Sequence, residues 1–410
     1  MLQLRPILST LRRHRTAAAL IVLEISLTCA IVSNAVFLIT ERLGRMNQTT
    51  GLVEDEIVRV TVTGIGKDQN PQALTQVDIA SLSAIPGVKS AVLTNQIPFG
   101  GSSWNSSVDL EPDQMHQTLN ATTYYGGDKL VETFGVKIIA GRDFNPDDYV
   151  TWEAVRDPDP KKQSKVGTIL ITRGMGERLF PGKNAVGQTL YMGNDPIRVI
   201  GVIEHLARPN DFQGAAGASY AAILPIVLPY TVGGDYVLRV DPARRAEVLT
   251  AAAAAIEKNG PSRIILEKKT FDELRAHYFR GDRSMAWLLV GVCVALLVIT
   301  ALGIVGLASF WVQQRTRQIG IRRALGATRR QILRYFQTEN FLLATIGIVI
   351  GMGLAYGINV WLMKRYELPR LPILFLPAGA LSLWGLGQLA VLGPAMRAAS
   401  VPPAVATRTV

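Results

Sequence analysis

The chain has 410 residues, of which 48% are hydrophobic, and it carries a formal net charge of +11. The apolar residues are concentrated in three runs, Ala17 to Thr40, Met285 to Val312 and Phe341 to Met363, which together contain one charged residue. Each run exceeds the roughly 20 residues that cross a hydrocarbon core. This distribution excludes an ordinary soluble protein and predicts membrane-spanning helices.

The first apolar run, residues 17–40, follows an N-terminal segment of residues 1–16 that holds four arginines and no acid. A cleaved signal peptide is one interpretation. However, 24 apolar residues are long for a signal peptide, and no small-x-small cleavage site follows. We therefore favour an uncleaved signal anchor.

Glu24 is the one charged residue in these three runs. An acid within a membrane is a functional candidate by default. The alternative, which we favour, is that its side chain pairs with a basic neighbour or reaches the membrane surface.

Residues 41–284 have the composition of a globular domain, in which short strands and helices alternate near both ends. Two β-α-β halves, about 50–140 and 231–284, predict a split, ferredoxin-like porter domain. The strand-rich middle, about 141–230, is expected to be an inserted subdomain. The predicted fold class is an α+β membrane protein with four transmembrane helices and a large outer domain between the first and the second.

The rest of the chain alternates between spans and short connections. We expect a second helix at 285–312, a cytoplasmic elbow at 313–338, a third helix at 339–363, an outer loop at 364–370, a fourth helix at 371–395 and a C-terminal segment at 396–410.

Arginine is distributed unevenly around these spans. Residues 1–16, 312–338 and 396–410 hold thirteen arginines and no acid, and the rest of the chain has 30 basic and 32 acidic residues. Basic segments next to spans stay in the cytoplasm. Both termini are therefore predicted inside and residues 41–284 outside. The basic charge reports this topology, and no nucleic-acid partner is expected.

No sequence motif predicts catalysis. The chain lacks a phosphate-binding loop, a G-x-S-x-G elbow and metal-ligand spacing among its four histidines. Its two cysteines, Cys29 and Cys293, lie in predicted spans, so the outer domain has no disulfide framework. We expect no enzymatic activity, no cofactor and no metal in this chain, and the lack of disulfides favours a bacterial source.

Small residues recur on the third span. Gly347, Gly351, Gly353 and Gly357 form two small-xxx-small pairs, which predict a helix-packing surface.

The segment from Arg315 to Arg334 holds seven arginines. Ile319, Ile321, Ala324 and Leu325 interleave with Arg322 and Arg323, which predicts a short amphipathic helix. Gly326 is expected to end this helix, and Thr328 with Gln331 forms a capping box for a new helix from about Arg329. A loop that binds only anionic lipid is the alternative.

The elbow sequence "RTRQIGIRRALGATRRQI" resembles the signature of MacB-like and FtsX-like ABC transporter permeases. The C-terminal "RAASVPPAVATR" and, in the outer domain, "FGVKIIAGRDF" and "RLFPGKNAVGQTL" are similar to further segments of that family. One departure is Gln318, where the family usually has Glu. The resemblance implies that the short helix is a coupling helix seated in a groove of a cytoplasmic ATPase. The residues implied in coupling are Arg317, Gln318, Ile319, Gly320, Ile321, Arg322, Arg323, Ala324, Leu325, Gly326 and Ala327.

The resemblance also implies a permease dimer, of two identical or two related chains, with two ATPase subunits that bind ATP and magnesium. Since only sixteen residues precede the first span, the ATPase is expected on a separate chain. The leading expectation is ATP-driven efflux or extraction in a Gram-negative inner membrane, with a periplasmic adaptor and an outer-membrane channel. The alternatives are antimicrobial-peptide sensing, control of cell-wall hydrolases and lipoprotein extraction.

Overall fold

The computed structural model describes residues 15–65, 70–210, 219–260, 262–366 and 370–400. Most of the expected cytoplasmic ends, and residues 367–369 of the expected outer loop, lie outside the described residues. The chain divides into two compact units, a helical unit from both ends of the chain and an outer domain, Gln48–Arg280.

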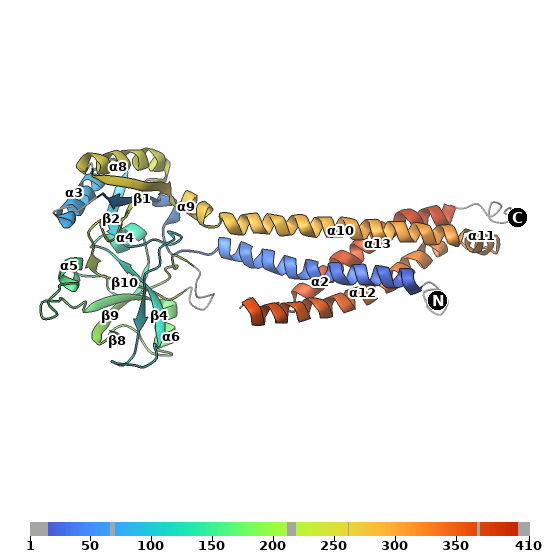
Figure 1. Ribbon diagram of the computed structural model, residues 1–410, viewed down its shortest axis with the longest axis horizontal. Helices are drawn as coiled ribbons and strands as arrows, with labels where there is room; N and C mark the ends of the chain where they lie inside the picture. Colours follow the sequence, from blue (N-terminus) through green and yellow to red (C-terminus); the bar gives the residue numbers. More distant parts are fainter. Residues whose placement is uncertain (1–14, 66–69, 211–218, 261, 367–369, 401–410) are drawn as a thin grey trace. The chain divides into compact units, whose positions relative to one another are not determined.

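Four described helices of the first unit are long and apolar enough to cross a membrane (Figure 1). They are α2 (Arg15–Met46), α10 (Arg280–Gln314), α12 (Arg329–Tyr366) and α13 (Phe375–Ser400). The first three extend beyond the predicted spans at both ends. The fourth begins later than predicted because the Phe375 N–H bonds the Pro372 carbonyl, at 3.0 Å, in a turn before the helix.

Helix α2 packs against both α12 and α13, and these two pack against each other. Within an apolar 18-residue stretch of each helix, 56% of the α2 stretch is buried, compared with 17% of the α10 stretch. Helix α10 therefore presents most of its surface away from the other three. It contacts α2 through a buried hydrogen bond of 2.9 Å between the hydroxyls of Thr28 and Thr300. Near the outer end, an ion pair joins Arg42 of α2 to Asp282 of α10.

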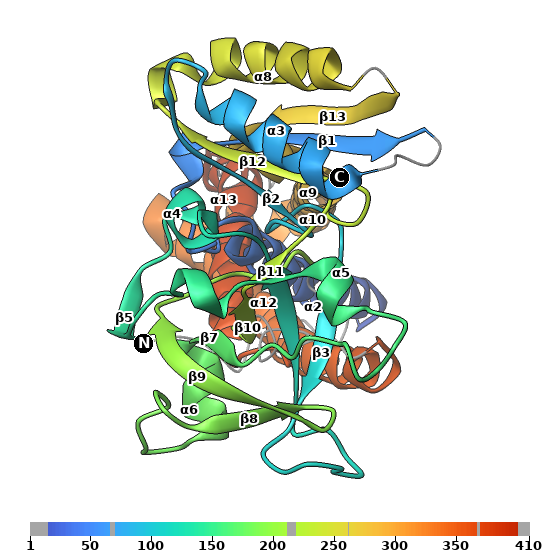
Figure 2. The ribbon, with the colours of Figure 1, turned by 90° about the vertical axis from the view of Figure 1, so that its left-hand side faces the viewer.

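The outer domain contains a four-stranded antiparallel sheet in the order β13-β1-β12-β2 (Figure 2). Its elements are β1 (Ile57–Gly64), α3 (Pro71–Ser83), β2 (Val88–Thr94), β12 (Asp235–Val240), α8 (Arg245–Asn259) and β13 (Arg263–Thr270). Helices α3 and α8 pack against the sheet and against each other. The sheet is built from two β-α-β units that are far apart in the sequence, β1-α3-β2 and β12-α8-β13. This is the split ferredoxin-like arrangement that the sequence predicts.

A seven-stranded mixed sheet forms the second part of the outer domain (Figure 2). Its strands are β3 (Asn105–Val108), β4 (Leu119–Tyr125), β5 (Ile138–Gly141), β7 (Thr168–Thr172), β8 (Thr189–Met192), β9 (Asp195–Ile203) and β10 (Ala221–Leu224). The expected boundary at residue 141 is therefore wrong, because β3 and β4 pair within this sheet. Strand β4 is buried against β10, a partner about a hundred residues away that its own sequence does not reveal.

The remaining elements are short. They are η1 (Glu54–Glu56), α4 (Leu130–Phe134), η2 (Pro146–Asp148), β6 (Val150–Thr151), α5 (Trp152–Val155), α6 (Arg173–Leu179), β11 (Ile226–Val227), η3 (Pro242–Arg244) and α9 (Phe271–Tyr278).

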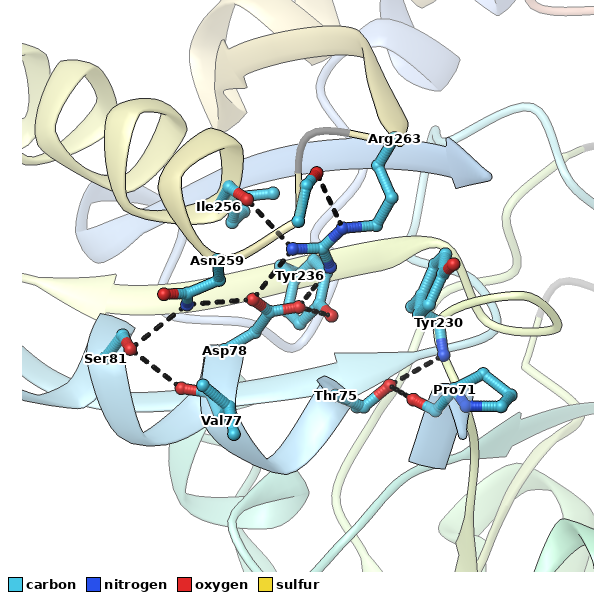
Figure 3. A network of polar contacts seen from close by, with 11 residues as sticks. Pro71, Thr75, Val77, Asp78, Ser81, Tyr230, Tyr236, Ile256, Asn259 and Arg263 are labelled. Atoms are coloured by element: carbon cyan, nitrogen blue, oxygen red, sulfur yellow. Dashed lines mark hydrogen bonds and ion pairs between the residues drawn. The ribbon is translucent and has the colours of Figure 1, made fainter. Parts of the chain in front are cut away.

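A buried ionic network ties the two halves of the four-stranded sheet together (Figure 3). Asp78 on α3 is fully buried and forms an ion pair with Arg263 at the start of β13, while the Tyr236 hydroxyl donates to Asp78 at 2.5 Å. The Asn259 amide donates to the other Asp78 oxygen at 3.0 Å. Elements from both ends of the domain sequence thus meet at one carboxylate.

Candidate functional site

The arginine-rich segment folds as a short helix followed by a tight turn. Helix α11 (Thr316–Ala324) has nine residues, and one residue, Arg315, separates it from the end of α10. Gly326 then adopts a φ of +97°, and the Ala327 N–H donates to the Arg322 carbonyl at 3.0 Å. This closing geometry favours glycine, because a Cβ is strained at positive φ.

The helix after the turn begins with a capping box. The Gln331 N–H bonds the Thr328 hydroxyl at 3.3 Å, and the Thr328 N–H bonds the Gln331 side-chain oxygen at 2.9 Å. The two reciprocal bonds satisfy N–H groups that a helix start leaves without partners. The predicted start of α12 at Arg329 is confirmed.

One side of α11 is anchored in the helical unit. Ile319 is 6% exposed and belongs to the same hydrophobic cluster as Trp311, Ile332 and Phe336. Gly320 beside it is buried as well. The elbow is therefore seated on the ends of its neighbouring helices.

The other side of α11 is exposed and partly apolar. Ile321 and Leu325, one turn apart, are 46% and 83% exposed, and Ala324 is exposed next to them. The expected amphipathic pattern is thus only partly right, because these three residues do not share a buried face with Ile319. Residues three or four apart face the same way, and 319 lies on the opposite side of the helix from 321 and 325.

The arginines of the elbow have different surroundings. Arg317 and Gln318 are exposed, whereas Arg323 and Ala327 are half-buried. The Arg322 guanidinium lies over the Tyr335 ring, 5.1 Å from its centroid, and so ties α11 to α12.

Arg315 and Glu339 form a buried ion pair that the sequence reasoning missed. One Arg315 nitrogen donates to both Glu339 oxygens, at 3.1 and 2.9 Å, and the two residues are 8% and 1% exposed. The signal that pointed to this pair was a lone acid, Glu339, shortly after the segment of seven arginines that ends at Arg334. Arg315 therefore does not contribute a free positive charge to the surface of the elbow.

Glu24 lies against the backbone of α10. A Cβ added at Gly303 would come within 2.5 Å of a Glu24 carboxylate oxygen. No ion pair of Glu24 occurs within the part of the chain that the structure describes.

The four glycines of the third span fall into two groups. A Cβ at Gly347 would lie 2.9 Å from the Ile25 Cβ, and one at Gly351 would lie 2.5 Å from the Cys29 Cβ, so both glycines allow α12 to approach α2 closely. At Gly353 and Gly357 an added Cβ would meet no described atom within 4 Å. The second small-xxx-small pair thus packs against no described residue of its own chain.

Family models match most of the chain. The MacB-like periplasmic core domain matches residues 18–258, more than half of the sequence, and the FtsX-like permease C-terminal model matches residues 290–403. The chain belongs to the MacB-like ABC transporter permeases. It is a transporter permease subunit, a membrane protein whose periplasmic domain lies between its first two helices.

Relatives of this permease include the macrolide export ATP-binding/permease protein MacB of Pasteurella multocida (strain Pm70), which is 26% identical over 68% of the chain. The uncharacterized ABC transporter permease YvrN of Bacillus subtilis (strain 168) is also 26% identical over 68%. The pyoverdine export ATP-binding/permease protein PvdT of Pseudomonas fluorescens (strain Pf0-1) is 24% identical over 84%. The matched segments span 40%, 68% and 49% of these three proteins.

Two solved structures are similar to part of the permease. The periplasmic region of MacB from Actinobacillus actinomycetemcomitans is 12% identical, with a TM-score of 0.33, over 57% of this chain and 97% of that one. The extracellular domain of YknZ, from Gram-positive bacteria, is 14% identical, with a TM-score of 0.32, over 51% of this chain and 100% of that one.

Proposed function

We propose that this permease couples an ATPase outside these 410 residues to conformational change of the periplasmic domain, for efflux or extraction of a substrate. The elbow receives the ATPase at its exposed face. Movement then passes along the membrane helices, and no substrate travels between them through the bilayer.

The observation that carries this proposal is the two-sided character of α11. Its inner side is fixed by buried Ile319 and by the contact between Arg322 and Tyr335, while Ile321 and Leu325 project from its outer side. A rigid helix that presents apolar side chains among arginines is suited to a protein groove with an acidic rim. A loop that binds only lipid charge has no need of a fixed shape.

The names of the relatives support the same class of function. MacB of Pasteurella multocida and PvdT of Pseudomonas fluorescens are both named as export ATP-binding/permease proteins. We propose by analogy that the permease acts as a homodimer or heterodimer with an ABC ATPase dimer. A periplasmic adaptor and an outer-membrane channel of a Gram-negative cell complete the proposed assembly.

The test compares two substitutions that alter the shape or the apolar surface of the elbow with a matched control in the outer domain. Gly326→Pro is incompatible with a φ of +97°, and Leu325→Asp places a charge on the exposed apolar pair. Leu266→Asp is the same substitution at a 62% exposed leucine of the outer domain. We expect capture of the ATPase on affinity purification to be lost, by at least about tenfold, in the two elbow variants and to be normal in the control.

A lipid-only elbow has a different signature. It predicts normal capture in both shape variants, and damage only when several of the exposed arginines are replaced by glutamine. Normal ATPase capture by Gly326→Pro and Leu325→Asp would therefore refute the coupling assignment.

A further inference from the structure

The elbow contains a second feature that lies on its buried side and does not belong to the docking face. Arg315 occupies the single position between α10 and α11, and its partner Glu339 lies on α12. The ion pair therefore joins the hinge between two helices to a third helix. Glu339 is the one acid in the sequence of α12.

Stability alone does not account for this pair. The second terminal nitrogen of Arg315, Nη2, and the Trp311 indole N–H are buried and have no acceptor among the described residues. The Arg315 guanidinium also lies 5.5 Å from the centre of the Trp311 ring. Replacing a buried ion pair by apolar side chains of similar volume often leaves the stability of a fold unchanged or raises it. Buried donors without acceptors add a further cost. Such a pair does hold its two elements in one geometry. If either partner moves away, the other charge is left alone in an apolar environment, which is unfavourable.

We infer that Arg315 and Glu339 are positioning residues that lock α11 to α12, so that a displacement of the elbow by the ATPase moves the two helices as one body. This inference rests on the proposed function. Docking depends on the exposed face of α11, whereas transmission depends on the buried pair. Losing the pair should therefore uncouple the permease while the ATPase stays bound.

The geometry explains why the pair is placed at this point. Along α10 the structure shows few contacts with the other helices, as the low burial of its apolar stretch indicates. Without a fixed link at residue 315, bending at the junction of α10 and α11 would absorb the movement of the elbow. The pair fixes residue 315, directly after the end of α10, to α12.

The first arm of the test uses the full-length permease alone in lipid nanodiscs. Cys29 and Cys293 are replaced by serine, and spin labels are attached to cysteines introduced at Ala324 of α11 and Ile346 of α12, both of which are exposed. We expect a narrow distance distribution in the parent and a broad one in Glu339→Gln. Arg315→Gln combined with Glu339→Gln removes both charges of the pair. It keeps the test valid if the single variant fails to fold, and its distance distribution should also be broad. Arg334→Gln, which removes an exposed arginine of α12, is the matched control and should stay narrow.

The second arm adds the co-purified ATPase. We expect Glu339→Gln and the double variant to capture the ATPase and to support its turnover, while the ATP-dependent change in protease sensitivity of the periplasmic domain is lost. Glu339→Asp, which keeps the carboxylate, should restore part of that response. If the parent responds to ATP and both Gln variants match it in each arm, the inference is wrong. Parallel loss of ATPase capture in the Gln variants would also overturn it, because the pair would then serve docking. If the parent itself captures no ATPase, the proposed function fails, and the spin-label arm still decides whether the pair locks the elbow.

Discussion

At the scale of single residues, the outer domain depends on one buried carboxylate. Asp78 accepts hydrogen bonds from Arg263, Tyr236 and Asn259, which come from β13, β12 and the end of α8. Burial beside this carboxylate raises the pKa of Tyr236 well above its ordinary value, with desolvation as the main cause, so the phenol remains a hydrogen-bond donor. The network is satisfied because every element supplies the donor that the carboxylate needs (Figure 3).

Replacing Asp78 by asparagine should destabilise the four-stranded sheet severely. The substitution leaves Arg263 buried without its counter-charge, which costs about 3–5 kcal/mol. Hydrogen exchange of the β12 and β13 amides, if it proceeds through global opening of this sheet, should accelerate by about two to four orders of magnitude in the full-length protein.

Glu247→Gln is the matched control for that experiment. Glu247 is an exposed acid on α8 whose pKa is lowered by the hydrogen bond from Arg244, and such surface pairs contribute little. Exchange should therefore be nearly unchanged in the control. Equal effects of the two substitutions would contradict a special role for Asp78.

At the scale of elements, the contact between α2 and α12 is set by two glycines. The backbone of α12 comes so close at Gly351 that an added Cβ would lie 2.6 Å from the Ser26 carbonyl oxygen. Small residues at such positions let helix backbones pack directly in a membrane. Gly353, only two positions away, is open because it points in another direction from the same helix.

Gly351→Ala and Gly353→Ala form a matched pair of variants on one helix. The first should lower stability by about 1–3 kcal/mol through overpacking, visible as a lower thermal unfolding midpoint in detergent. The second should be neutral or raise stability slightly, since alanine favours a helix by about 1 kcal/mol over glycine. A lower midpoint in Gly353→Ala would show that this face is packed as well, for example against a second copy of the permease.

At the scale of the whole molecule, the topology follows from arginine bias, so the elbow is expected in the cytoplasm and residues 48–280 outside. The two native cysteines are buried, which allows a cysteine-free background. A single cysteine at Met115, which is 96% exposed, should react with an impermeant maleimide in intact spheroplasts.

A cysteine at Leu325, which is 83% exposed, should react only after the membrane is opened. Because both sites are highly exposed in the structure, a difference in reaction reports the side of the membrane on which each site lies. Reaction at Leu325 in intact spheroplasts would reverse the predicted orientation.

Sequence by itself determined the features that depend on local composition. The four apolar helices, the strands and helices at both ends of the outer domain, the glycine turn at 326 and the capping box at 328 each follow from residues close together in the chain. The length and hydrophobicity of a segment determine whether it can form a membrane helix. A backbone position with positive φ favours glycine, and the free N–H groups at a helix start favour a capping side chain such as threonine.

The features that depend on residues far apart in the sequence became clear only from the tertiary structure. It assigned β3 and β4 to the seven-stranded sheet, separated Gly351 from Gly353, and turned Ile321 and Leu325 outward while burying Ile319. It also showed that Arg315 is not a free surface charge, because Arg315 pairs with Glu339 of α12. The amino-acid composition gives the number of charged residues but not their surroundings. A charged side chain becomes buried and paired only when folding packs a second element against it.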